Sequence, residues 1–180
     1  MEKIKQQQGV TFIELLVSLA VVAILISVAA PAFQQMVVNN RVESTAELLR
    51  NSILHARNTS IQNKSAHSVR LNGDASAITG WVVGATGDFT SRLIVEAVNE
   101  QIELKEYSGA AANIDYNSYG YIAGSEDLVK RVFTVCHKDG ESGLMGKAVI
   151  LSSSGMVMIK NANQSIEDPA NPANTIDICQ

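Results

Sequence analysis

Residues 10–33 read VTFIELLVSLAVVAILISVAAPAF, an apolar run whose one charged side chain is Glu14. As an α-helix rising about 1.5 Å per residue, this run is roughly 36 Å long, which is enough to cross a hydrocarbon core of about 30 Å. We therefore predict a transmembrane helix over residues 10–33. A carboxylate in such a helix is disfavoured by up to about 3.5 kcal/mol at the bilayer centre and by less near the interface, so Glu14 is expected to need a partner.

A short basic leader, Met1–Gly9, precedes the apolar run and contains Lys3 and Lys5. A secretory signal peptide would have a shorter apolar region followed by a small-residue cleavage site. Here the leader stops at Gly9 before the apolar run begins, so a cut at that point would remove the leader and keep the helix. The lysines favour a cytoplasmic N-terminus, which places the chain beyond Phe33 on the far side of the membrane, the periplasm in a bacterium.

The helical pattern continues over residues 34–64 but becomes amphipathic. Apolar or small residues recur there at steps of four and three: Val42, Ala46, Leu49, Ile53, Ala56 and Ser60. This spacing predicts a helix to about Asn63, whose apolar stripe packs on the domain's own sheet or, alternatively, in a partner's groove. Pro31 lacks an N–H donor inside the run, so we expect it to bend or loosen the helix.

Beyond Lys64 the helical periodicity gives way to short apolar segments separated by turn residues. The predicted strands are His67–Leu71, Ala77–Val83, Leu93–Val98, Gln101–Tyr107, Asn113–Tyr116, Arg131–Cys136, Ala148–Ser152 and Met156–Lys160, of which Leu93–Val98 also fits a helix. Turns are predicted at Asn72-Gly73, Asp139-Gly140 and Ser154-Gly155. The expected fold is α+β: a long N-terminal helix on an antiparallel sheet or small two-sheet sandwich, residues 65–180, with an irregular tail from Asn161.

The chain has two cysteines, Cys136 and Cys179. No other cysteine supplies zinc-ligand spacing, so we expect no metal site. A disulfide is the preferred interpretation because the inferred compartment is oxidising, and it would tie the C-terminus to the domain. The alternative is that both cysteines are small buried hydrophobic side chains.

No catalytic constellation emerges from the sequence. The three histidines, His55, His67 and His137, lack an Asp or Glu partner at motif spacing, and no phosphate-binding loop, nucleophile elbow or zinc-protease motif is present. Trp81 is expected in the core rather than on a binding platform. The net charge of -4 argues against a general nucleic-acid binder, which normally shows a basic face. We expect a non-catalytic protein without a cofactor.

The segment Gln8–Val17, QGVTFIELLV, resembles the processing site of type IV pilins and type II secretion pseudopilins. In that family a prepilin peptidase cuts after the glycine and methylates the new N-terminus, and the fifth mature residue, a glutamate, directs assembly. The resemblance assigns cleavage and methylation to Gly9 and Val10, and assembly to Glu14. Pilins also commonly have a proline near the place of Pro31. Four further segments are similar to the GspH/FimT family of minor subunits: Arg50–Ile61, Ile114–Gly120, Phe133–Cys136 and Val149–Val157.

The resemblance implies a minor pilin or pseudopilin that waits in the inner membrane and enters a filament near its tip. Its implied partners are prepilin peptidase, other major and minor subunits, the inner-membrane assembly platform and membrane lipid. The pattern fits a type IV pilus and a type II secretion machine equally.

Two alternatives belong to other classes of protein. A DNA-binding minor pilin for natural transformation is expected to carry basic residues near its final strand and tail, where this chain has Glu167, Asp168 and Asp177, so nucleic acid is not an expected partner. A membrane-anchored periplasmic binding protein would not be processed after Gly9.

Overall fold

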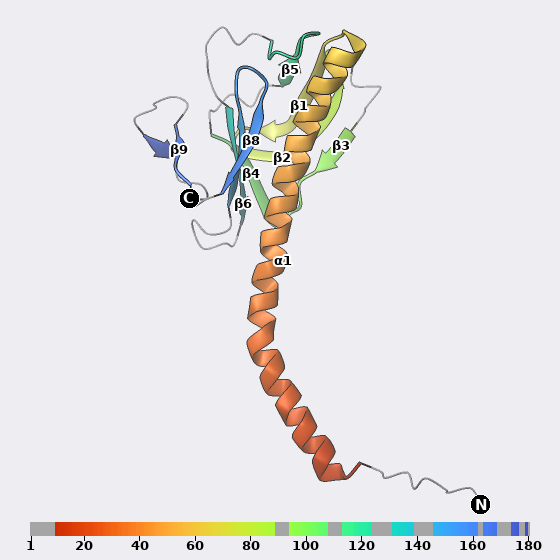
Figure 1. Cartoon of the computed structure of the whole chain (residues 1–180), viewed down its shortest axis with the longest axis vertical. Coiled ribbons are helices and arrows are strands. Elements are labelled where there is room, and N and C mark those ends of the chain that lie inside the picture. The colour runs from red at the N-terminus through yellow and green to blue at the C-terminus, as the bar shows by residue number, and fades with distance from the viewer. Residues whose placement is uncertain are drawn as a thin grey trace, which may run out of the picture. The chain divides into compact units, whose positions relative to one another are not determined.

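The computed structural model describes residues 10–88, 94–107, 113–123, 131–138, 146–161, 164–168, 174–176 and 179 (Figure 1). The leader, including Gly9, and the predicted turn at Asp139-Gly140 lie outside the described residues. The chain divides into two compact units, one ending at Val37 and the other beginning at Val38. Helix α1, Phe12–Asn63, runs through both.

The first unit consists of the apolar part of α1. Every described side chain from Val10 to Met36 is exposed. By length and composition this part of the helix is able to cross a membrane. The helix is assigned without a break through Pro31, so the bend expected there stays a prediction.

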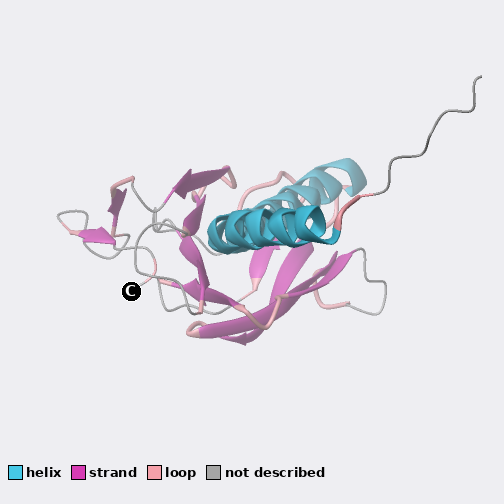
Figure 2. Ribbon diagram, turned by 90° about the horizontal axis from the view of Figure 1, so that it is seen from below, coloured by secondary structure: helices cyan, strands magenta, loops and turns pink. Residues whose placement is uncertain are grey.

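In the second unit, α1 buries the stripe that the sequence predicts. Val42, Ala46, Leu49, Ile53, Ala56 and Ser60 are all buried, and the helix ends at Asn63, as predicted. The stripe packs on the protein's own strands, which settles the choice between an internal sheet and a partner's groove (Figure 2). Burying this face, rather than intrinsic propensity, is what stabilises such a helix.

The strands form two four-stranded antiparallel sheets. The first sheet has the order β3-β2-β1-β5, with β1 His67–Asp74, β2 Ala77–Ala85, β3 Ile94–Ala97 and β5 Ile114–Tyr116. The second sheet has the order β4-β6-β7-β8, with β4 Ile102–Glu106, β6 Arg131–His137, β7 Lys147–Leu151 and β8 Val157–Asn161. Each predicted strand exists, and the segment that also fitted a helix is strand β3.

The main core lies between α1 and the inner faces of both sheets. It includes Leu49 and Ile53 from the helix, Trp81 from β2 and Phe133 from β6. The Trp81 indole N–H donates to the buried hydroxyl of Ser52 on α1 at 2.9 Å. Trp81 is therefore a core residue, as predicted, and its one polar atom is satisfied inside the core.

A second, smaller core covers the outer face of the β4-β6-β7-β8 sheet. Val132, Ala148 and Ile150 of this face meet Ile166 and Ile176 of the C-terminal segment. These two isoleucines belong to a short antiparallel pair, β9 Ile166–Glu167 and β10 Thr175–Ile176. The prediction of an irregular tail is wrong for these residues, because burial against the sheet orders strands too short to show alternation in the sequence.

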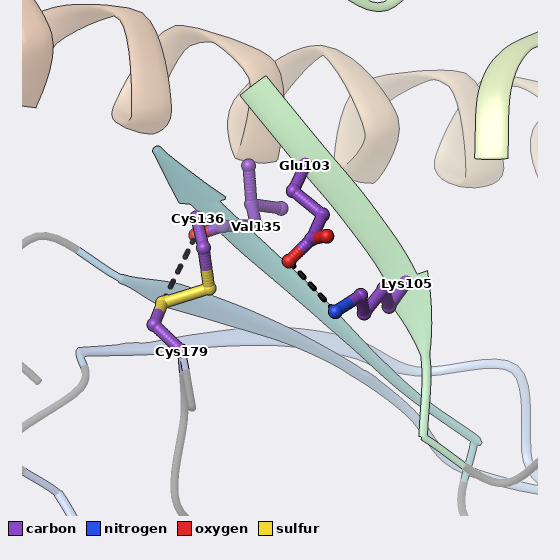
Figure 3. The surroundings of a disulfide bond; sticks show 5 residues. All are labelled: Glu103, Lys105, Val135, Cys136 and Cys179. Atoms are coloured by element: carbon purple, nitrogen blue, oxygen red, sulfur yellow. Dashed lines mark hydrogen bonds and ion pairs between the residues drawn. A yellow bond between two sulfur atoms is a disulfide. The ribbon is translucent and has the colours of Figure 1, made fainter. Parts of the chain in front are cut away.

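A disulfide joins Cys136 of β6 to Cys179, with the two Cα atoms 5.5 Å apart (Figure 3). Cys136 is buried within the second core, and Cys179 packs against that core. The bond closes a loop with a sequence separation of 43. It therefore fixes the C-terminal segment over the sheet, as the sequence predicts for an oxidising compartment.

The first hairpin turns later than the sequence predicts. Asn72 and Gly73 belong to β1 and pair with Gly80 and Ile78 of β2, so the register skips Thr79 of β2 between them, and Gly73 has a φ of +101°. The two residues therefore lie opposite a bulge within the strands and not in the turn. The turn follows at Ala75 and Ser76. Donation from the Ser76 hydroxyl, and from the backbone N–H groups of Ser76 and Ala77, lowers the pKa of the Asp74 carboxyl.

Two turns of identical pattern occur at Asn117–Tyr121 and at Ser152–Met156. In each, the first N–H donates to the fifth carbonyl and the fourth N–H to the first carbonyl, all at 2.9 Å. The fourth residue of each turn is a glycine with a φ of +79°. This is a three-residue hairpin loop closed by a glycine bulge, so the turn predicted at Ser154-Gly155 is confirmed.

Arg57 of α1 joins the two turns. Its Nε donates to the carbonyl of Gly120 at 3.0 Å, and its NH2 group donates to the carbonyl of Ser154 at 3.5 Å. The turns also touch one another, because a Cβ on Gly155 would lie 2.9 Å from the Gly120 carbonyl oxygen. Through these hydrogen bonds, the C-terminal part of α1 holds together a turn of the first sheet and a turn of the second.

Candidate functional site

The candidate site is the first turn of α1, which begins two residues after Val10. Thr11 precedes the helix, and its hydroxyl oxygen accepts the backbone N–H of Glu14 at 3.3 Å. The Thr11 carbonyl accepts the first helical bond, from the Leu15 N–H at 3.2 Å. Thr11 is thus the N-cap, and Thr-x-x-Glu is the sequence pattern of a capping box.

Glu14 therefore lies in the first turn, where a negative charge is favoured by the partial positive charge of the helix N-terminus. Glu14 is a predicted site residue, whereas the role of Thr11 as N-cap is not among the predictions from the sequence. The signal was available, because a threonine three residues before a glutamate at the start of an apolar run marks a helix N-terminus.

The polar side chains of the apolar run differ in whether they have a partner. The hydroxyl of Ser18 donates to the Glu14 carbonyl, and that of Ser27 donates to the Ile24 carbonyl at 2.7 Å. Thr11 is satisfied by its cap. Within the described chain, the carboxylate of Glu14 has no cation or hydrogen-bond donor beside it, and it is exposed among exposed apolar side chains. Inside a hydrocarbon core, an ionised group in this setting would be costly without a compensating partner.

The other predicted site residues are placed as follows. Val10 is exposed and precedes the cap, Pro31 lies inside α1, and Cys136 and Cys179 form the disulfide. Gly9 lies outside the described residues. The disulfide stabilises the fold of the second unit and is not part of the candidate site in the first turn of α1.

No second chemical site stands out among the described residues. They contain no group of three or more His, Cys, Asp or Glu side chains that could hold a metal. His55 is exposed, whereas His67 is buried with its Nδ1 3.1 Å from the Ser65 carbonyl. Burial raises the pKa of the Tyr116 hydroxyl far above its ordinary value, so this group stays protonated and unreactive.

A cleft of about 650 Å³ lies beside the disulfide. Glu103 and Lys105 line it from β4 and form an ion pair at 2.8 Å, so their charges neutralise one another (Figure 3). Thr134 and Thr175 add neutral hydroxyl groups to the lining. The described part of the lining therefore offers no uncompensated charge with which to hold an ionic ligand.

Comparison with known proteins gives two kinds of match, one to the N-terminal segment that contains the first turn of α1 and one to the fold. Residues 4–30 match the family model described as the prokaryotic N-terminal methylation motif. The chain thus combines a prepilin-type N-terminus with the α+β fold of a type IV minor pilin.

The fold is similar to that of the type IV minor pilin FimU of Pseudomonas aeruginosa, in crystals of space group P21. That match has a TM-score of 0.58 and 19% sequence identity and covers 78% of this chain and 96% of the crystallised FimU chain. In space group P65 the same protein gives a TM-score of 0.56 and 18% identity, covering 77% of this chain and 99% of the crystallised FimU chain. No curated protein sequence matches.

Proposed function

We propose that this protein is a minor pilin-type subunit, a structural building block and not an enzyme. Cleavage after Gly9 and methylation of Val10 produce the mature chain. The apolar half of α1 holds it in the inner membrane with the β-rich unit in the periplasm. The subunit then enters a filament by packing this half of α1 against the helices of its neighbours, in a pilus or in a secretion pseudopilus.

The observation that carries the proposal is the state of Glu14. Its carboxylate is the one side-chain polar group of the described apolar run that has no partner among the described residues, and it lies in the first turn of α1, inside the stretch that matches the methylation motif. The positive amino terminus of Val10 on a neighbouring subunit supplies a compensating charge when helices pack side by side.

The test compares Glu14→Gln with wild type in cells that make the filament. Glutamine keeps the size and hydrogen-bonding oxygen of the side chain but removes the charge. Membrane insertion and cleavage should be unchanged, because neither step uses the ion pair, and the amount of subunit in sheared filaments should fall at least tenfold. Glu14→Asp, which keeps the charge with a shorter reach, should lie between the two.

Equal recovery of Glu14→Gln and wild type in filaments would show that the carboxylate does not dock the subunit. Quantitative immunoblotting of the filament fraction against the membrane fraction measures both. An unprocessed protein confined to the membrane in wild-type cells would instead favour the membrane-anchored binding protein.

A further inference from the structure

Strand β8 is an edge strand whose outer hydrogen-bonding groups can be assigned from its register. It pairs with β7 on one side, with Ile150 opposite Met158 and Leu151 opposite Val157. The Ser152 N–H donates to the Met156 carbonyl, which makes that pair hydrogen-bonded. Bonded and non-bonded pairs alternate in an antiparallel ladder, so Met158 points its backbone groups toward β7, and Val157 and Ile159 point theirs outward.

These outward groups are open in the described part of the chain. Neither Val157 nor Ile159 exchanges a backbone hydrogen bond with any other described element. The next outward N–H, that of Asn161, is closed by the side-chain oxygen of Gln164 at 3.2 Å. The open stretch therefore runs from Val157 to Ile159 and ends in a cap, which is the length of a short strand contact.

Exposed apolar side chains flank this stretch. Met156, which directly precedes β8, is 60% exposed, and Met158, which lies within β8, is 48% exposed. Tyr119 and Tyr121, on the turn that touches Gly155, are 78% and 57% exposed. Unbranched methionine side chains adapt to varied partners, and tyrosines are enriched at the centres of interfaces.

Near the open edge of β8, positive side chains lack a carboxylate partner in the described chain. Lys147 is paired with Glu43 at 3.5 Å, but Arg57 and Lys160, near the two ends of β8, donate only to backbone carbonyls in the described chain. Lys160 donates to the Ser165 carbonyl at 3.2 Å. In a chain of net charge -4, this edge is a locally positive surface that favours an acidic partner.

We propose that the open edge of β8 is a docking site for an extended, acidic segment of a neighbouring pilin-type subunit, which adds a strand to the β4-β6-β7-β8 sheet. Backbone groups of Val157 and Ile159 supply main-chain hydrogen bonds, Met156 and Met158 contact alternate side chains, and Arg57 and Lys160 attract carboxylates at either end. This inference rests on the proposed function, because it needs a neighbouring subunit in the filament. It concerns the β-rich unit and is independent of Glu14.

The first test places a photo-crosslinking amino acid at Met158 of the full chain, in cells that make the filament. Irradiated filaments should yield an adduct between this position and a strand of a second subunit that itself carries the methylation motif, as mapped by mass spectrometry. The same amino acid at Thr79, which is exposed on β2 of the other sheet, is the control and should give no such adduct. Filaments that contain the subunit but show no Met158 adduct, or an adduct only with a helix, would overturn the proposal.

The second test uses proline to remove one outward N–H. Ile159→Pro deletes a donor that points away from β7, so the ladder is kept, whereas Met158→Pro deletes a ladder donor. Ile159→Ala controls for the lost side chain. With the crosslinker at Met156, Ile159→Pro should reduce the adduct at least tenfold and Ile159→Ala less than threefold, while both keep the wild-type circular dichroism spectrum.

Equal adduct yields for the Ile159 variants would overturn strand addition. If Ile159→Pro does not fold, the Met158 adduct in the unaltered chain still decides the question. Absence of the wild-type subunit from filaments would count against the proposed function itself, whereas its presence there without an adduct counts against the edge alone.

Discussion

Gly155 holds a backbone conformation that an L side chain adopts only with strain, in a place where no side chain fits. A Cβ there would lie 2.9 Å from the Gly120 carbonyl oxygen, 2.9 Å from the Tyr116 ring and 3.1 Å from Nε of Arg57. Gly87 has a similar φ, +84°, but nothing lies within 4 Å of its Cβ position. Comparing substitutions at the two glycines therefore distinguishes the free-energy cost of the backbone conformation from that of a steric clash.

We expect Gly87→Ala to destabilise the folded state by roughly 1–2 kcal/mol, the usual cost of this conformation for an L residue. Gly155→Ala should cost more, because the turns must also separate and weaken the bonds of Arg57. Urea denaturation of both variants measures the two free energies of unfolding. Equal values would mean that the contact between the turns does not contribute to stability.

Gly9 is the residue at which the resemblance places cleavage. Substitution Gly9→Val puts a β-branched side chain where the peptidase must approach the backbone, so the full-length precursor should accumulate in the membrane. Intact mass measurement distinguishes precursor from mature chain. Mature-length protein in this variant would contradict cleavage after Gly9.

The C-terminal segment is an element that the disulfide holds in place. Its strands β9 and β10 have two residues each and pair only with one another in the described chain, so they lack the size to be stable alone. On the chain-entropy account, a loop of this size contributes about 4 kcal/mol. The main core, in contrast, contains neither cysteine.

We therefore expect Cys179→Ser to release the C-terminal segment locally while α1 and the eight main strands stay folded. Hydrogen exchange should show lost protection around Ile166 and Ile176, and near-wild-type protection in the part of α1 beyond Val38. Reduction of the unaltered protein should give the same pattern. Uniform loss of protection over the β-rich unit would contradict two separable cores.

The sequence predicts the helix and the main strands well, but it predicts poorly the turns and the contacts that join these elements. The stripe from Val42 to Ser60 and the alternation in the strands arise from burial repeated over many residues, so they are visible in the chain. The pairing of the two cysteines followed from compartment and count. The β9–β10 pair and the displaced first turn depend on a few tertiary contacts, which leave no periodic trace. The bridge that Arg57 makes across 63 residues to Gly120 has no local signal at all.

The proposed sites also differ in whether the sequence alone reveals them. Glu14 is predictable because one charge in an apolar run is conspicuous, and Thr11 could have been predicted from its spacing to Glu14. The open edge of β8 could not, since strand order is a property of the folded sheet. In the sequence, Val157 and Ile159 are simply members of one predicted strand among eight.

The charge of the whole molecule sets an expectation for nucleic acid. With a net charge of -4, and with acidic residues in its C-terminal segment, the protein should bind duplex DNA no more tightly than a weak non-specific ligand. Such binding is on the order of 10⁻⁴–10⁻⁶ M at physiological salt. Fluorescence anisotropy of a version beginning at Gln34 measures it. Submicromolar, salt-sensitive binding would favour the DNA-binding alternative.

Helix α1 belongs to both compact units as one hydrogen-bonded element, and this has a mechanical consequence. Tension applied to the apolar half reaches Leu49 and Ile53 through successive helical turns, without passing through a loop. At the other end of the chain, the covalent bond to Cys136 prevents the C-terminal segment from being peeled away under load. In the filament proposed above, we therefore expect tension to pass mainly along the packed helices.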